Sequence, residues 1–174
     1  MIDTLEIAKQ IELVIFDVDG VLTDGSLYIG DDGQEYKAFN SKDGHGIRML
    51  QQGGIKTAII TGRTSNVVEI RARDLEIEFV MQGHRNKRPV FTELLQTTGL
   101  TASQAAYIGD DVVDLPVMRQ VGFAIAVNDA PEMVKQHAHY VTQARGGKGA
   151  AREACEFILD AQGLLDGLLQ SYLT

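Results

Sequence analysis

The chain has 174 residues, of which 44% are hydrophobic and 23% charged, and its formal net charge is -8. This length fits one domain with one core, and the acidic balance argues against a nucleic-acid-binding surface. No apolar run reaches the ~18 residues that cross a bilayer, residues 1–12 lack the pattern of a signal peptide, and Cys155 is the single cysteine. We therefore expect a cytoplasmic protein without a nucleic-acid or membrane partner.

Short apolar runs alternate with longer segments that carry helix signals. Near-continuous apolar runs are typical of buried parallel strands, and here they cover residues 13–16, 55–60, 79–81, 105–108, 123–127 and 140–141. Between them, Ser65 is a possible N-cap before residues 66–74, Thr101 or Ser103 begins a short helix, and Pro131 fits a first helical turn. The alternation predicts an α/β fold with a doubly wound, mostly parallel, Rossmann-like sheet and right-handed crossovers.

Two segments interrupt this alternation. Residues 26–39 have the pattern of an inserted β-hairpin with its turn at residues 30–33. Residues 145–149 read Arg-Gly-Gly-Lys-Gly and are followed by a predicted helix over residues 150–161 and a leucine-rich tail. No linker or repeat divides the chain. We therefore expect one domain over residues 1–174, with the hairpin at 26–39 and the glycine-rich segment, helix and tail at 145–174.

An acidic motif directly follows the first predicted strand. It reads Asp-Val-Asp-Gly at residues 17–20. Ligands of open α/β sheets bind at the carboxyl ends of the strands, and Gly20 suggests that the chain turns so that both carboxylates approach one centre. Asp17 could then attack phosphorus while Asp19 protonates the leaving oxygen. Taken alone, the same residues are also compatible with an acidic loop that contains a turn glycine.

Three further motifs favour phosphate chemistry. Residues 61–63, Thr-Gly-Arg, end the second strand, and a hydroxyl with exposed backbone N–H groups at such a turn binds phosphate oxygens. Lys87 begins a predicted helix. Residues 109–114, Gly-Asp-Asp-Val-Val-Asp, end a later strand with three carboxylates, which together with phosphate and water suit octahedral Mg²⁺.

The order and spacing of these motifs resemble the haloacid dehalogenase superfamily of phosphohydrolases, through DVDGVLTD, ITGR, Lys87 and GDDVVD. The resemblance covers roughly residues 10–145. It implies Asp17 as nucleophile, Asp19 as general acid and base, and Thr61 and Lys87 as groups that stabilise the phosphoryl charge. It also implies Mg²⁺ held by Asp17, the backbone carbonyl of Asp19 and Asp110. Asp111 and Asp114 would orient the metal's water molecules and Lys87.

The finer pattern resembles one subgroup of that superfamily. Residues 24–61 and 61–87 leave no room for a cap domain, and DVDGVLTDG, residues 39–46 and RGGKGAARE are similar to the 3-deoxy-D-manno-octulosonate 8-phosphate phosphatases. This resemblance implies hydrolysis of a phosphorylated eight-carbon sugar acid for lipopolysaccharide precursor synthesis. It also implies a homotetramer with shared active sites. Phosphatases of nine-carbon, sialic-type sugar acid phosphates stay an alternative, and the choice among Mg²⁺, Mn²⁺ and Co²⁺ stays open.

Several charged residues are candidates for reading the rest of the substrate. Arg63 and Arg71 could meet its carboxylate, although a helix arginine such as Arg71 is equally compatible with a solvated face. Asp43 could instead cap the helix that follows it. We expect residues 145–149 to close over the substrate of a neighbouring subunit. The predicted substrate contacts are Asp19, Asp24, Asp43, Thr61, Gly62, Arg63, Arg71, Lys87 and Arg145.

A phosphoacceptor signalling module is a distant alternative. Such a domain also combines aspartates, a hydroxyl residue and a lysine in a small α/β sheet. Its acceptor would follow a later strand, whereas here the acidic pair after the first strand supplies nucleophile and acid together. Asp19 beside the acceptor would also shorten the life of a phosphoprotein, so the lifetime of the phosphorylated protein separates the two functions.

Overall fold

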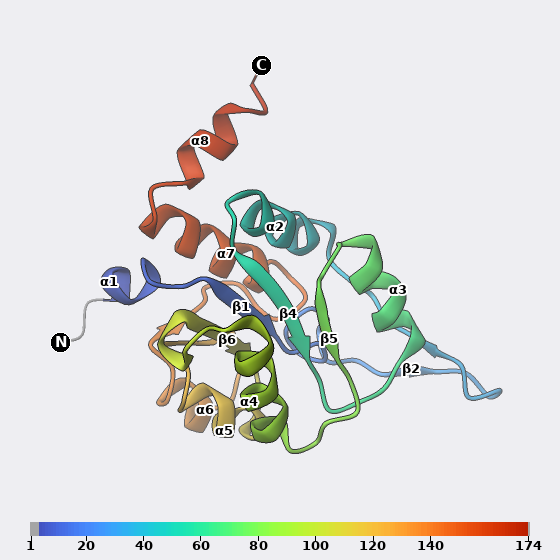
Figure 1. Ribbon diagram of the computed structural model, residues 1–174. Helices are drawn as coiled ribbons and strands as arrows, with labels where there is room; N and C mark the ends of the chain where they lie inside the picture. Colours follow the sequence, from blue (N-terminus) through green and yellow to red (C-terminus); the bar gives the residue numbers. More distant parts are fainter. Residues whose placement is uncertain (1–3, 174) are drawn as a thin grey trace.

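The computed structural model describes residues 4–173, which build a six-stranded sheet between two layers of helices (Figure 1). Every neighbouring pair of strands in this sheet is parallel, and the strand order is β5-β4-β1-β6-β7-β8. The doubly wound sheet is thus confirmed. The strands are β1 (Leu13–Phe16), β4 (Lys56–Ile60), β5 (Phe79–Met81), β6 (Ala105–Gly109), β7 (Phe123–Ala126) and β8 (Tyr140–Val141).

Helices cover both faces of the sheet, as right-handed crossovers require. On one face lie α2 (Ser41–Gln52), α3 (Asn66–Asp74) and α7 (Ala150–Ala161). On the other lie α4 (Lys87–Thr98), α5 (Leu115–Met118) and α6 (Glu132–Lys135) (Figure 1). The strands β1 and β6 are buried along their whole length, which explains their near-continuous apolar sequence.

The remaining elements are short. They are α1 (Thr4–Ala8), α8 (Leu165–Gln170) and two 3₁₀ turns, Ala102–Gln104 and Val112–Asp114. Thr101, one of the two starts that we expected, is the N-cap residue of the first of these turns, and its N–H donates to Gln104 Oε1 at 2.9 Å. Ser65 occupies the N-cap of α3 without a side-chain capping hydrogen bond. Pro131 is the N-cap residue of α6 and so precedes the first turn in which we expected it. Within residues 4–173 no helix combines the length and apolarity needed to cross a membrane.

The predicted hairpin is present and projects away from the sheet (Figure 1). Its strands β2 (Tyr28–Ile29) and β3 (Glu35–Tyr36) pair in antiparallel fashion, and Gly33 adopts a positive φ of 80° in the turn. The hairpin and α2 are the only elements between β1 and β4. Only α3 and β5 separate β4 from α4. Within residues 4–173, therefore, no cap domain lies over the carboxyl edge of the central strands.

The glycine-rich segment at residues 145–149 packs against the acidic loop, residues 17–24, of its own chain. The N–H of Gly147 donates to the Val21 carbonyl at 2.8 Å. A Cβ atom on Gly146 would overlap the carbonyl oxygen of Gly20, and one on Gly147 would overlap the backbone at Thr23. We expected these glycines to provide a mobile cover for a neighbouring subunit. That expectation stays a prediction, and in the single chain the same glycines allow a close backbone approach that supports the acidic loop.

This close approach makes Gly146 sensitive to substitution. We expect Gly146→Ala to lower the free energy of unfolding by about 1–3 kcal/mol, because the added methyl group meets backbone that cannot rotate away. Gly167→Ala is the matched control, since a Cβ there meets nothing within 4 Å and alanine favours the helix. Thermal unfolding of both variants measures the effect, and equal melting temperatures would contradict the packing role.

Candidate active site

The predicted motifs meet at the carboxyl ends of three adjacent strands. The acidic loop follows β1, Thr61 follows β4, and Asp110 follows β6. Because the chain passes from β1 to β4 on one side while β6 lies on the other, this edge is the switch point of the sheet, where ligands bind. A cavity of about 370 Å³ opens there. It is lined by Asp17, Asp19, Thr61, Gly62, Arg63, Arg85, Lys87, Asp110, Asp111 and Val113.

Lys87, the first residue of α4, anchors the floor of this cavity. Its side chain is 1% exposed, and its ammonium lies 2.9 Å from Asp17 Oδ2, 2.7 Å from Asp114 Oδ1 and 3.0 Å from the Tyr107 hydroxyl. These contacts match the three donors of an ammonium group. Burial acts to lower the pKa of Lys87, but the carboxylates of Asp17 and Asp114 outweigh it and the pKa is raised. The lysine therefore stays charged and fixes the position of Asp17.

Asp114 organises the site from below. It is fully buried, and its Oδ1 accepts hydrogen bonds from Lys87 and from the Tyr107 hydroxyl at 2.8 Å. Its Oδ2 accepts the backbone N–H groups of Asp110 and Asp111 at 3.0 and 3.2 Å. Four accepted bonds occupy the lone pairs of one carboxylate. Asp114 thus orients Lys87, as the family resemblance implied, and has little capacity left to coordinate a metal.

Asp17 and Asp110 form a candidate metal site. Carboxylate oxygens of Asp17, Asp110 and Asp114 all lie within 4.8 Å of one another. Burial first, and then the charges of the neighbouring aspartates, raise the pKa of Asp110 to about 8, and the same two causes raise the pKa of Asp17. Because Asp114 is saturated, Asp17 and Asp110 are the carboxylates free to bind a hard divalent cation. The carboxylate of Asp19 contacts Lys37 and not this cluster. The atom of Asp19 that we predict to bind the metal therefore stays its backbone carbonyl oxygen.

Gly20 permits this convergence. It adopts a φ of 91°, a region that favours glycine, and a Cβ atom there would overlap the carboxylate of Asp110. The glycine that the sequence analysis interpreted as a turn therefore also lets the acidic loop approach β6 closely.

Thr61 provides the neutral part of the cavity. Its N–H donates to the Met81 carbonyl at 3.0 Å, and its own carbonyl accepts the N–H of His84 at 3.1 Å. These bonds fix the backbone on both sides of the buried side chain. Among residues 4–173 nothing bonds to the Thr61 hydroxyl, which is therefore available to a phosphate oxygen entering the cavity.

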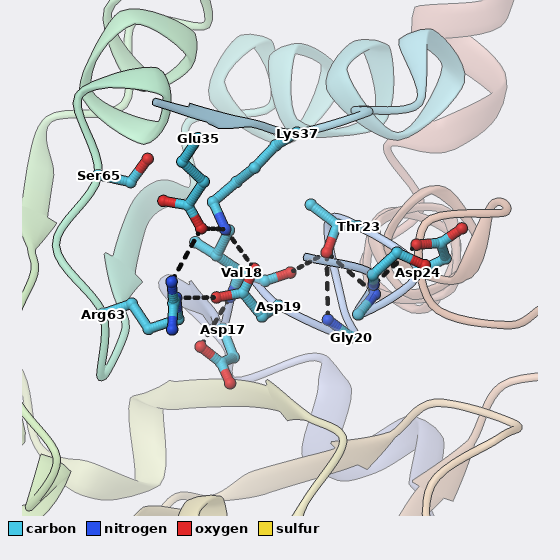
Figure 2. Close-up of polar contacts among 12 residues, drawn as sticks. Asp17, Val18, Asp19, Gly20, Thr23, Asp24, Glu35, Lys37, Arg63 and Ser65 are labelled. Atoms are coloured by element: carbon cyan, nitrogen blue, oxygen red, sulfur yellow. Dashed lines mark hydrogen bonds and ion pairs between the residues drawn. The ribbon is translucent and has the colours of Figure 1, made fainter. Parts of the chain in front are cut away.

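Two charged residues of the hairpin lie beside Asp19 without lining the cavity, and the sequence analysis did not single them out. Figure 2 shows Lys37 and Glu35 extending toward Asp19, with Arg63 beside Glu35. The Lys37 ammonium lies 2.5 Å from Asp19 Oδ1 and 3.1 Å from Glu35 Oε1. Arg63 contacts the same Glu35 oxygen at 3.1 Å. Side chains alternate along a strand, so Glu35 and Lys37 lie on the same face, opposite to Tyr36. This alternation is the signal in the sequence that could have identified them.

The other four predicted substrate contacts, Asp24, Asp43, Arg71 and Arg145, do not line the cavity. Asp43 is buried, and its carboxylate accepts the N–H groups of Gly149 and Arg152 at 3.3 and 2.9 Å. It thereby caps α7, a helix that is far from Asp43 in the sequence but adjacent to it in space. The N-cap of α2, the helix that contains Asp43, is Asn40.

Arg71, Asp24 and Arg145 have local surroundings of their own. Arg71 pairs with Asp74 at 2.7 Å, and its guanidinium lies over the ring of Phe39. Asp24 accepts the N–H of Ser26 at 3.0 Å, and Arg145 is exposed. A substrate role for these residues stays a prediction.

Comparison with known proteins places this geometry in a family. Residues 73–153 match the haloacid dehalogenase-like hydrolase model. The chain is 49% identical over 165 residues to the 3-deoxy-D-manno-octulosonate 8-phosphate phosphatase KdsC of Yersinia pestis, an alignment that covers 95% of this chain and 88% of the relative. The chain belongs to this phosphatase family. It is therefore a phosphoric monoester hydrolase, and the signalling alternative is set aside.

Two solved structures of similar proteins agree closely with the fold. The phosphatase of this name from Moraxella catarrhalis, in complex with a magnesium ion, a phosphate ion and KDO (3-deoxy-D-manno-octulosonate), is 41% identical. It has a TM-score of 0.95, and the match covers 97% of each chain. The cobalt-bound deoxy-D-mannose-octulosonate 8-phosphate phosphatase of Haemophilus influenzae is 42% identical with a TM-score of 0.93, over 97% of this chain and 99% of that one.

The crowding of carboxylates has a measurable consequence. Asp110→Asn removes a carboxyl group whose ionisation the buried cluster opposes, so above pH 8, where that group is charged, we expect the metal-free variant to melt higher than the parent protein, by roughly 2–4 °C per kcal/mol of relieved repulsion. The same variant should lose most of the increase in melting temperature that Mg²⁺ gives the parent protein. Asp160→Asn is the matched control, because Asp160 is exposed on α7 and is not part of the carboxylate cluster. An undiminished Mg²⁺ response of Asp110→Asn would exclude it as a ligand.

Proposed function

We propose that this protein, acting as one catalytic domain of residues 1–174, hydrolyses 3-deoxy-D-manno-octulosonate 8-phosphate to the free sugar acid and inorganic phosphate. The reaction would supply lipopolysaccharide precursor synthesis. The observation that carries the proposal is the Moraxella relative, which matches this chain over 97% of its length and was solved with magnesium, phosphate and the sugar acid together. The cavity of this chain combines the groups that such a reaction needs.

The proposed chemistry uses Asp17 as nucleophile. One Asp17 oxygen attacks phosphorus in line with the sugar oxygen; the bond from phosphorus to that oxygen breaks, and Asp19 gives it a proton. In the second step Asp19 takes a proton from water as the water oxygen attacks the aspartyl-phosphate. Phosphate leaves, and the Asp17 carboxylate is regenerated. Contacts of Asp17 with the Lys87 ammonium and with the N–H of Val18 at 2.7 Å hold the nucleophile for both steps.

Asp17, Asp110 and the backbone carbonyl of Asp19 are the proposed ligands of Mg²⁺. When bound, the ion offsets the repulsion between an attacking carboxylate and a phosphate dianion. Lys87 contributes further positive charge beside the nucleophile, and the Thr61 hydroxyl is the proposed donor to a phosphoryl oxygen. Arg63, at the rim of the cavity and 47% exposed, is the proposed partner of the substrate carboxylate.

A phosphate-release screen with Mg²⁺ tests the reaction. We expect a higher kcat/KM for the eight-carbon sugar acid phosphate than for hexose phosphates or nine-carbon sugar acid phosphates. Asp17→Asn should abolish turnover of every substrate without unfolding the chain, because an amide is not a nucleophile here. Asp160→Asn, an exposed position on α7, is the matched control. A preference for the nine-carbon acids would overturn the substrate assignment, and turnover by a folded Asp17→Asn protein would overturn the covalent mechanism.

We also propose that the protein is a homotetramer whose active sites are shared between subunits. The hairpin carries four exposed apolar side chains on short edge strands, an arrangement that favours association. These are Leu27, Tyr28, Ile29 and Tyr36.

Light scattering tests the assembly, with an expected mass near four times the 19.0 kDa of one chain. Ile29→Asp should lower that mass, because it places a charge where the side chain is 63% exposed in the isolated chain and would be buried on association. Met133→Asp, at an exposed apolar position on α6 far from the hairpin, should leave the mass unchanged. A monomeric parent protein with full activity would contradict the shared site.

A further inference from the structure

Asp19 is held by a side chain from outside the four motifs. Resting on the proposed function, we propose that Lys37, supported by Glu35, is a positioning residue that orients Asp19 for its two proton transfers. Lys37 does not line the cavity, so it acts through Asp19 and not on the substrate.

The hairpin aims these two side chains inward. Glu35 and Tyr36 form β3, and Lys37 follows directly. Successive side chains of an extended strand point to opposite sides, so Tyr36 faces outward, where it is exposed, while Glu35 and Lys37 face the acidic loop (Figure 2). The Lys37 side chain is only 1% exposed, although the hairpin itself lies at the surface. The lysine is therefore directed to a specific partner and does not extend into solvent.

The charges around Lys37 are balanced in pairs. Lys37 contacts both Asp19 and Glu35, and Glu35 also contacts Arg63. Burial acts to raise the pKa of Glu35, but the hydrogen bonds from Lys37 and Arg63 outweigh it and the pKa is lowered. Glu35 therefore stays anionic and keeps the Lys37 ammonium in place. Two cations and two anions compensate one another, which makes burial of the lysine acceptable.

Asp19 has few other constraints on its side chain. Within residues 4–173 its carboxylate contacts only Lys37, at 2.5 Å, and Arg63, at 3.9 Å. A general acid must lie within hydrogen-bond reach of the leaving oxygen, and small displacements of such a group are costly. Because Arg63 is half exposed and distant, the close contact with Lys37 is what sets the direction of Asp19.

The test compares two leaving groups in Lys37→Met, which keeps the length of the side chain and removes its charge. An alkyl phosphate such as the sugar acid phosphate needs a proton on its leaving oxygen, whereas p-nitrophenyl phosphate does not. We expect kcat/KM to fall about 10–100-fold for the alkyl phosphate and less than about 3-fold for p-nitrophenyl phosphate. Lys37→Arg should recover much of the loss, because it restores a cation between Asp19 and Glu35.

A double-mutant cycle separates positioning from general damage. If Lys37 acts through Asp19, then Asp19→Asn with Lys37→Met should be no slower on the alkyl phosphate than Asp19→Asn alone. Additive losses, or equal losses for both leaving groups, would overturn the inference. Melting temperatures show whether each variant is folded, and if Lys37→Met is not, Glu35→Gln is put through the same comparison. The outcome depends only on ratios of variant to parent, so any alkyl phosphate that the parent hydrolyses serves, even if the proposed sugar acid is not the substrate.

Discussion

The buried lysine at the floor of the cavity is the interaction on which the rest of the site depends. Three carboxylates lie close together beneath a cavity that must accept a phosphate, and one ammonium group is the cation among them. Like charges at this distance repel strongly when water is excluded. Lys87 reduces the repulsion, and Asp114 fixes Lys87 through its Oδ1 while its Oδ2 holds the turn after β6. The remaining imbalance, at Asp17 and Asp110, is the charge that the proposed divalent cation would offset.

Close backbone approaches bring the charged groups within range of one another. Gly109 lies so near Asp114 that a Cβ atom would be 2.7 Å from the Asp114 Cβ, and Gly20 lies against Asp110. Behind Gly20, the segment at residues 145–149 packs on the acidic loop, and Asp43 in turn caps the helix that this segment begins. The chain thus forms a continuous stack from α2 through α7 and the acidic loop to β6. The C-terminal part of the sequence thus supports the geometry of the acidic loop, more than one hundred residues away.

The sequence predicted what depends on local pattern. Buried parallel strands are apolar throughout, and the residues directly after them must lie at one edge of the sheet. Asp17, Thr61 and Asp110 could therefore be assigned to one site from the sequence. Asp43 could not be placed in the same way, because its partner is the N-terminus of a helix more than one hundred residues later. The close backbone contact of the glycines at residues 146–147 with the acidic loop could not be predicted either, because it joins segments more than one hundred residues apart. Lys37 and Glu35 were missed because charged residues on a surface hairpin are ordinarily solvated.

Side chains alternate along the second strand of the hairpin, so its two faces contact different parts of the protein. Tyr36 faces outward with the apolar side chains that we propose to be buried between subunits, while Glu35 and Lys37 face the acidic loop. A two-stranded ribbon is marginally stable by itself, so whatever fixes its outer face also fixes its inner face. Association of subunits through Tyr28, Ile29 and Tyr36 would therefore hold the Lys37 ammonium against Asp19. In that arrangement, association of the subunits would fix the position of the proposed general acid, Asp19. In a phosphatase with a cap, closure of the cap domain would have the same effect.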